Sequence, residues 1–393
     1  MDVVRNPYAP GAGTPPPELA GRSDVLSHAQ NALLRVQQRR PAQSLILVGL
    51  RGVGKTVLLV RMREIAREIG YHALMLEVNE NRRLPSLLVP SLRQALFRFN
   101  RVDAAKEQAR RGLRVLRSFL QCFKLYFPDA NVSITVAPEE GTADSGDLEA
   151  DLSELFGAVG AAATAAGQSL VLLIDELQYL PEQEFSALIM ALHRMNQDNM
   201  PLVMIGAGLP QIHGLAGASK SYAERLFRFP EIGALREPDA EAALVNPARE
   251  EGVTYEKTAI SEILRTTERY PYFLQQWGYD VWNAAQNETI TERDVITATT
   301  IALRTLDEGF FKVRFDRCTP AERRYLRAMA ELGPGHHRSG DIAEKLALKV
   351  TSVGPTRSSL IKKGMIYSPQ HGDNAFTVPL FDSYMKRAIP EFP

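Results

Sequence analysis

The stretch Ser44-Leu-Ile-Leu-Val48, followed by Gly49-Leu-Arg-Gly-Val-Gly-Lys55-Thr56, combines an apolar run with a glycine-rich loop. The loop fits the P-loop pattern G-x-x-x-x-G-K-[ST] at every fixed position. Glycines let such a backbone turn tightly, so that its N–H groups point at phosphate oxygens. In this motif the lysine reaches the β- and γ-phosphates, and the threonine hydroxyl is a ligand for Mg²⁺. A helix is expected over 57–69, and the positive end of its dipole would face the same phosphates. The sequence therefore predicts a nucleotide site formed by Gly49, Leu50, Arg51, Gly52, Val53, Gly54, Lys55, Thr56 and Val57.

Length and composition restrict the class of protein. The 393 residues predict two or three domains, and an apolar fraction of 45% is typical of a globular protein. Lys plus Arg and Asp plus Glu number 46 each, so no overall charge indicates nucleic acid or an acidic partner. The two cysteines, Cys122 and Cys318, match no metal-binding spacing and suit a reducing compartment. Because no apolar run approaches the roughly 18 residues of a membrane span, we expect a cytoplasmic protein with no membrane partner.

A second motif supplies the remaining chemistry of a nucleotide site. Leu170-Val-Leu-Leu-Ile174 is a continuous apolar run, typical of a parallel strand buried on both faces, and Asp175-Glu176 follows it. Asp175 is expected to hold Mg²⁺ together with Thr56, and Glu176 to act as the general base for an attacking water. The seven histidines form no competing Ser/His/Asp or Cys/His signature. Since phosphoryl transfer needs mainly positioning and charge neutralisation, the two motifs predict ATP hydrolysis.

The order of predicted elements indicates an α/β protein with a parallel sheet, followed by a helical part. A Pro/Gly-rich leader comes first and is expected to be extended or disordered. Beyond residue 318, three helices followed by two short strands predict a winged helix-turn-helix. The expected division is leader 1–18, P-loop core 19–236, helical lid 237–315 and winged helix 316–393.

On these motifs the chain resembles the AAA+ P-loop ATPases of the initiator (origin-recognition-like) type, which grade into the STAND and archaeal-type ATPases. The resemblance covers residues 19–393 and implies ATP and Mg²⁺ as cofactors and a homo-oligomer. Leu19-Ala-Gly-Arg22 resembles the segment that lines the adenine pocket. Gly206-Ala-Gly208 lies where the sensor-1 strand ends, and members of the family usually carry Asn, Ser or Thr there. The resemblance therefore implies slow hydrolysis.

Two further assignments rest on the same resemblance. Residues 222–228 resemble the segment that carries an arginine finger, so Arg225 and Arg228 are candidates to reach a neighbouring subunit's γ-phosphate. The alternative is a surface helix whose arginines pair with Glu224 and Glu231. Pro271 opens a lid helix where, in the STAND and archaeal relatives, a proline contacts the nucleotide.

The last segment suggests a partner for the ATPase. Residues 318–393 contain 11 Lys or Arg and 7 Asp or Glu, and the helix expected over 351–363 would be the recognition helix. Its predicted DNA contacts are Lys349, Arg357, Lys362 and Lys363. We therefore expect an ATP-hydrolysing switch that couples nucleotide state to DNA binding.

Two other functions stay open. Because a winged helix can also bind protein, the first is a STAND-like signalling or defence scaffold without DNA. The second is a degenerate ATPase that binds nucleotide only structurally, against which Lys55, Thr56, Asp175 and Glu176 argue.

Overall fold

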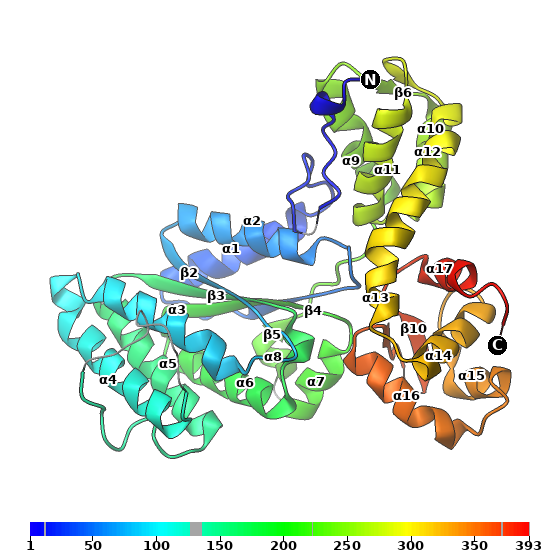
Figure 1. Cartoon of the computed structure of the whole chain (residues 1–393). Helices are drawn as coiled ribbons and strands as arrows, with labels where there is room; N and C mark the ends of the chain where they lie inside the picture. The colour runs from blue at the N-terminus through cyan, green and yellow to red at the C-terminus, as the bar shows by residue number, and fades with distance from the viewer. Residues whose placement is uncertain (12, 126–135, 222, 371, 393) are drawn as a thin grey trace.

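The computed structural model describes residues 1–11, 13–125, 136–221, 223–370 and 372–392, which form three lobes (Figure 1). The first lobe is built on a parallel five-stranded sheet in the order β2-β3-β4-β1-β5. Its strands are β1 (Ser44–Val48), β2 (Tyr71–Glu77), β3 (Ser169–Asp175), β4 (Leu202–Gly208) and β5 (Phe227–Arg228). The predicted α/β fold with a parallel sheet is confirmed.

Helices cover both faces of this sheet (Figure 1). Helices α1 (Ser23–Gln37) and α2 (Lys55–Glu68) lie on one face. The other face carries α3 (Leu84–Phe99), α4 (Lys106–Cys122), α5 (Leu148–Ala165), α6 (Glu182–Gln197), α7 (Ile212–Ser219) and α8 (Ala223–Leu226), with short turns η2 (Asp103–Ala105) and η4 (Leu177–Tyr179). In β1, Leu45 and Leu47 pack on the first face while Ile46 and Val48 pack on the second. Burial on both faces explains why the strand is apolar throughout.

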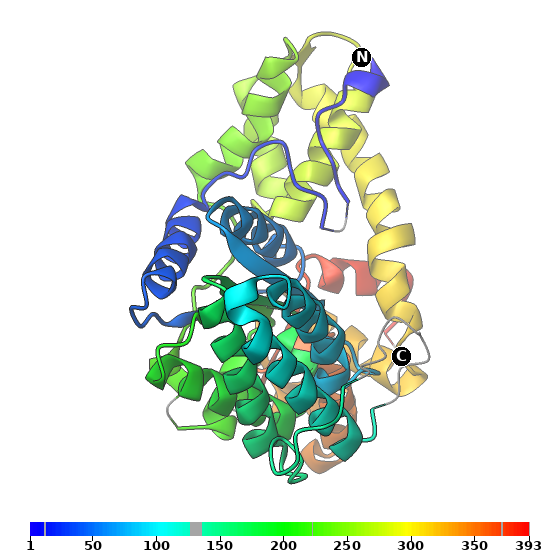
Figure 2. The same ribbon diagram turned by 90° about the vertical axis from the view of Figure 1, so that its left-hand side faces the viewer.

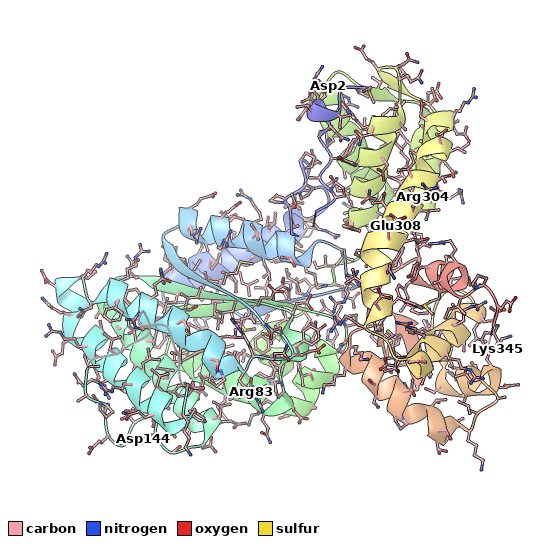
Figure 3. The ribbon with its side chains drawn as sticks, viewed as in Figure 1. Asp2, Arg83, Asp144, Arg304, Glu308 and Lys345 are labelled. Carbon is pink, nitrogen blue, oxygen red and sulfur yellow. The ribbon has the colours of Figure 1, made fainter. Side chains whose placement is uncertain are left out.

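The second lobe is the helical lid. It contains α9 (Glu237–Glu250), α10 (Lys257–Thr266), α11 (Pro271–Ala284) and α12 (Glu292–Thr305), with the short parallel pair β6 (Thr254–Tyr255) and β7 (Thr289–Ile290). Helix α12 continues without a break through the π-helical turn η5 (Leu306–Phe311) into α13 (Lys312–Asp316). This continuous helix connects the lid with the third lobe, and Figure 3 shows Arg304 and Glu308 along it.

The third lobe follows α13. It comprises α14 (Pro320–Glu331), β8 (His337–Arg338), α15 (Ser339–Lys345), α16 (Val350–Lys362), β9 (Ile366–Tyr367), β10 (Asp373–Phe376) and α17 (Phe381–Ala388). The three strands form an antiparallel sheet in the order β8-β10-β9. Three helices and a hairpin were predicted here, whereas β8 and α17 were not. The winged-helix assignment and the domain boundaries stay predictions.

The N-terminal leader lies along the lid (Figure 2). It contains one 3-10 turn, η1 (Val3–Arg5). Tyr8 is 3% exposed, and its hydroxyl donates to the carbonyl of Leu244 and contacts the hydroxyl of Tyr255. A Cβ at Gly278 would lie only 2.6 Å from the Tyr8 ring, so glycine makes the notch that admits this ring. The expected disorder is therefore not what the structure describes: the leader is extended but bound.

Among the described residues, no helix combines the length and the apolar character needed to cross a lipid bilayer.

Candidate nucleotide site

The P-loop forms a cradle for an anion at the carboxyl edge of the sheet. Gly52 and Gly54 have φ of +82° and +90°, a backbone conformation that glycine adopts readily. A Cβ at Gly54 would meet no atom within 4 Å, so open space lies beside the start of α2. Nζ of Lys55 donates to the carbonyl oxygens of Gly49 (2.8 Å) and Leu50 (2.7 Å). The loop and the helix N-terminus together provide donors and positive charge for phosphate.

Lys55 is buried, and its environment acts on its charge. Burial lowers the pKa of its ammonium group to about 8, and the positive charge of Arg51 acts in the same direction. The carboxylates of Glu176 and Asp175 oppose this lowering because they favour the charged ammonium. A bound phosphate would favour the charged form in the same way.

Two oxygen ligands for a metal lie side by side. Oγ1 of Thr56 donates to Oδ2 of Asp175 at 2.6 Å, and both residues face the carboxyl edge of the sheet. Burial raises the pKa of the Asp175 carboxyl, and the hydrogen bond from Thr56 opposes that rise. Hydroxyl and carboxylate oxygens are the ligands that Mg²⁺ takes in phosphate sites. The pair therefore fits the metal that the motifs imply.

Glu176 stands next to this pair in a left-handed conformation, with φ of 57°. Its Oε2 accepts a hydrogen bond from the side-chain amide of Gln178, and its Oε1 lies 3.5 Å from Nη1 of Arg51. Oε1 of Gln178 in turn accepts from the backbone N–H of Leu209 at 3.0 Å. Gln178 thus connects the carboxylate to the end of β4.

The same packing explains the glycines at the end of β4. A Cβ at Gly206 would lie 2.3 Å from Cδ1 of Leu177, so no side chain fits there. At Gly208 a Cβ would lie 3.2 Å from Oε1 of Gln178. The side chains that follow β3 fill the space where the family resemblance leads us to expect a polar residue.

A cavity of about 720 Å³ opens above the P-loop, and several segments distant in sequence line it. Leu19, Ala20 and Arg22 line it from the segment before α1, and Pro271 lines it from α11. The lid is joined to the loop directly, because the hydroxyl of Tyr270 donates to the carbonyl of Arg51 at 2.7 Å. The segments that the sequence singled out therefore meet around one cavity.

Two parts of the cavity wall were missed by sequence reasoning. The leader contributes residues between Ala9 and Glu18, and a Cβ at Gly13 would lie 3.5 Å from Cγ2 of Thr56. From α13, Arg314 lines the cavity with its guanidinium 4.0 Å above the ring centroid of Phe310. Burial, together with the charge of Arg51, lowers the pKa of Arg314 to about 10. No sequence signal marks either part, since each comes from a distant segment and matches no motif.

The comparison with known proteins agrees with this geometry. Residues 18–205 match the family described as "AAA ATPase domain". The chain carries an AAA ATPase domain. Within the part of it that is described, this domain contains the P-loop, Asp175 and Glu176. Residues 308–385 match a second family, which is described as a domain of unknown function. No curated protein is significantly similar in sequence to this chain.

Several solved structures resemble the chain at low identity. The RuvB Holliday junction branch migration motor of Thermotoga maritima is 14% identical, with 95% of this chain and 99% of that chain covered and a TM-score of 0.46. The Orc1 protein of Aeropyrum pernix in complex with DNA is 15% identical, with coverage of 95% and 94% and a TM-score of 0.48. Cdc6p from Pyrobaculum aerophilum is 12% identical, with coverage of 99% and 98% and a TM-score of 0.48.

The candidate arginine fingers do not line the cavity of their own chain. Arg225 lies in α8 and Arg228 belongs to β5 at the edge of the sheet, and both side chains are exposed. Among the described residues, no ion pair joins either arginine to Glu224 or Glu231, and Tyr222 at the start of the segment is outside the described residues. A role in a neighbouring subunit's site stays a prediction.

The four predicted DNA contacts divide into two pairs. Lys349 and Lys362, at the two ends of α16, are exposed. Arg357 donates to Oδ1 of Asn374 at 2.7 Å and to the hydroxyl of Ser368 at 2.8 Å, which ties α16 to the hairpin. Nζ of Lys363 lies 2.7 Å from Oε2 of Glu322 on α14. Arg357 and Lys363 are thus engaged inside the third lobe, in this arrangement, rather than presented at its surface.

Proposed function

We propose that this protein binds ATP with Mg²⁺, hydrolyses it slowly, and couples its nucleotide state to the third lobe, residues 316–393. One observation carries the proposal: Lys55, the Thr56–Asp175 pair and Glu176 converge at the P-loop, beside a cavity that the lid and the leader enclose. A buried site of this kind strengthens electrostatic interactions with phosphate, because water screens them less.

The residues take separate roles in this proposal. Lys55 and the P-loop N–H groups bind the phosphates, and Thr56 with Asp175 would hold Mg²⁺, which neutralises phosphate charge when bound. Glu176 accepts a proton from the attacking water. Its existing contacts with Gln178 and Arg51 support slow turnover, because water must compete with them for the carboxylate oxygens.

Two substitutions separate binding from hydrolysis. Lys55→Ala should abolish stabilisation by ATP, which in the intact protein amounts to a few kcal/mol at saturating nucleotide. Glu176→Gln should keep that stabilisation but lose turnover by about 10²- to 10⁴-fold, because only the base is removed. Thermal unfolding with and without ATP, together with phosphate release, measures both effects. Lys257→Ala on the exposed start of α10 is the control. Full ATP stabilisation in Lys55→Ala would contradict the proposed site.

We further propose DNA as the client of the third lobe. The lobe has an excess of four positive charges over residues 318–393, and Lys349 and Lys362 are exposed on α16. Each phosphate neutralised adds about 0.9 to the magnitude of the negative slope of log K against log salt concentration. If each lysine neutralises one phosphate, Lys349→Ala together with Lys362→Ala should lower that magnitude by about two. Because the charge excess is small, assembly on ATP would place several lobes on one duplex and raise the affinity by avidity. The measurement is a salt-titrated DNA-binding assay with and without ATP.

A specific observation favours a second candidate, a scaffold that binds protein. Leu348 and Val350 flank Lys349 at the start of α16, and they are 49% and 54% exposed. Exposed apolar side chains on a would-be recognition helix suit a protein surface better than a phosphate backbone. If the assembled, ATP-bound protein shows no salt-sensitive DNA binding at low ionic strength, this signalling or defence function becomes the better interpretation.

A further inference from the structure

The third lobe contacts the P-loop at Arg51. The backbone N–H of Arg51 donates to the carbonyl of Thr377 at 3.1 Å. Thr377 is 1% exposed, and its hydroxyl donates to the carbonyl of Gly364 at 2.6 Å. Gly364 has φ of +63°, and a Cβ there would lie 2.9 Å from Nη2 of Arg51. The lobe therefore holds both the backbone and the side chain of this loop residue.

The side chain of Arg51 also contacts Glu176, the proposed general base. Its Nη1 lies 3.5 Å from Oε1 of Glu176, and its Nη2 donates to the hydroxyl of Tyr179 at 2.7 Å. The side chains of Arg51 and Glu176 are 19% and 23% exposed, so their charges are screened less than those of a surface pair. Arg51 thus stands between the docked lobe and Glu176.

We infer that Arg51 is a positioning residue, which holds Glu176 in a resting geometry as long as the third lobe is docked. With Gln178 on Oε2 and Arg51 beside Oε1, both carboxylate oxygens are engaged, and a general base must itself be within hydrogen-bond reach of the water. Undocking removes Thr377 and Gly364 from Arg51, and the guanidinium is then free to leave Glu176. This inference rests on the proposed function, since it names what regulates the base of that site.

A methyl group at the contact tests the inference. Gly364→Ala places a side chain against Arg51. Gly335 in the same lobe also has a positive φ, of +100°, but a Cβ added there would meet no atom within 4 Å. We expect Gly364→Ala to raise kcat for ATP severalfold with unchanged ATP affinity, and Gly335→Ala to behave as wild type. Equal rates in the two variants would overturn the inference.

A double-mutant cycle separates positioning from a general structural effect. Arg51→Gln should also raise kcat, and the double variant with Gly364→Ala should be no faster than the faster single variant, because both changes act through one contact. Rates that multiply would show that Gly364 acts elsewhere and would contradict the inference.

Hydrogen exchange gives a readout that does not depend on turnover. The Arg51 amide should be protected in the full-length protein without nucleotide, and it should lose protection in Gly364→Ala but not in Gly335→Ala, with the peptides of α14 protected in all three. Unchanged protection at Arg51 would overturn the docking contact. By contrast, absence of turnover in every variant, with the exchange pattern as expected, would contradict the proposed hydrolysis and leave the contact established.

Discussion

Lys55 must be charged to bind phosphate, and its burial beneath the glycine loop works against that charge. In the free protein its pKa lies at about 8, below the value of an exposed lysine. Bound phosphate favours the protonated form, so the pKa in the complex is higher than in the free protein. Above pH 8, binding therefore requires proton uptake.

The affinity for ATP should consequently depend on pH in one direction. We expect Kd to be constant from pH 7 to nearly 8 and then to rise by up to about tenfold per pH unit, until the pKa of the complex is reached. Titration with a fluorescent ATP analogue between pH 7 and 9.5 measures this. Lys55→Arg is the control, since a guanidinium stays charged over the whole range. An equally steep rise in Lys55→Arg would show that another group titrates.

Among the individual residues of the nucleotide site, the sequence predicted those that belong to a local motif. Lys55 and Thr56 follow from the P-loop motif, and Asp175 joins them because parallel strands bring their carboxyl ends to one edge of the sheet. Gln178 and Arg314 were not predicted. Their roles depend on which side chains fill the space beside Gly208 and on where α13 passes the cavity, and neither is a local property.

Among the elements, the leader differs most from its sequence-based expectation. Its Pro- and Gly-rich composition is that of a linker, and composition cannot distinguish a free linker from one that has a docking surface. The docking surface is the notch at Gly278 on α11, more than 200 residues away in sequence. The long-range partner, not the local sequence, orders this segment.

Tyr8 is the anchor through which the leader can be tested. Tyr8→Ala removes a buried ring, at a cost of about 3–5 kcal/mol of stability, and should release from the cavity wall those leader residues that line it. We therefore expect weaker ATP binding together with a lower Tm. Tyr8→Phe keeps the ring and loses only the hydroxyl contacts, at a cost of about 1 kcal/mol, so ATP affinity should be nearly unchanged. ATP titrations of both variants below their Tm measure this difference. Undiminished ATP affinity in Tyr8→Ala would show that the leader does not contribute to ATP binding.

At the scale of the whole molecule, the prediction concerns the association of several subunits. Arg225 and Arg228 are exposed and do not line the cavity of their own chain, so any contact with a γ-phosphate must be made in a neighbouring subunit. Hydrolysis per subunit should then rise with protein concentration. Subunits carrying Arg225→Ala and Arg228→Ala, mixed with Glu176→Gln subunits, should regain activity, because each kind lacks a different half of a shared site. A rate per subunit that is independent of concentration, without recovery on mixing, would make these arginines ordinary surface residues.

The unbroken helix from Glu292 to Asp316 couples the position of the third lobe to that of the lid. Its 25 residues span about 37 Å, so a swing of about 10° at the lid end displaces the other end by about 6 Å. Such a displacement is about twice the length of the hydrogen bond between Arg51 and Thr377. Thr305, Gly309 and Arg314 border the nucleotide cavity along the half of this helix that leads to the third lobe, and the π-helical turn lies among them. A rotation of the lid by this angle on nucleotide binding would therefore move the third lobe far enough to break its hydrogen bond with Arg51.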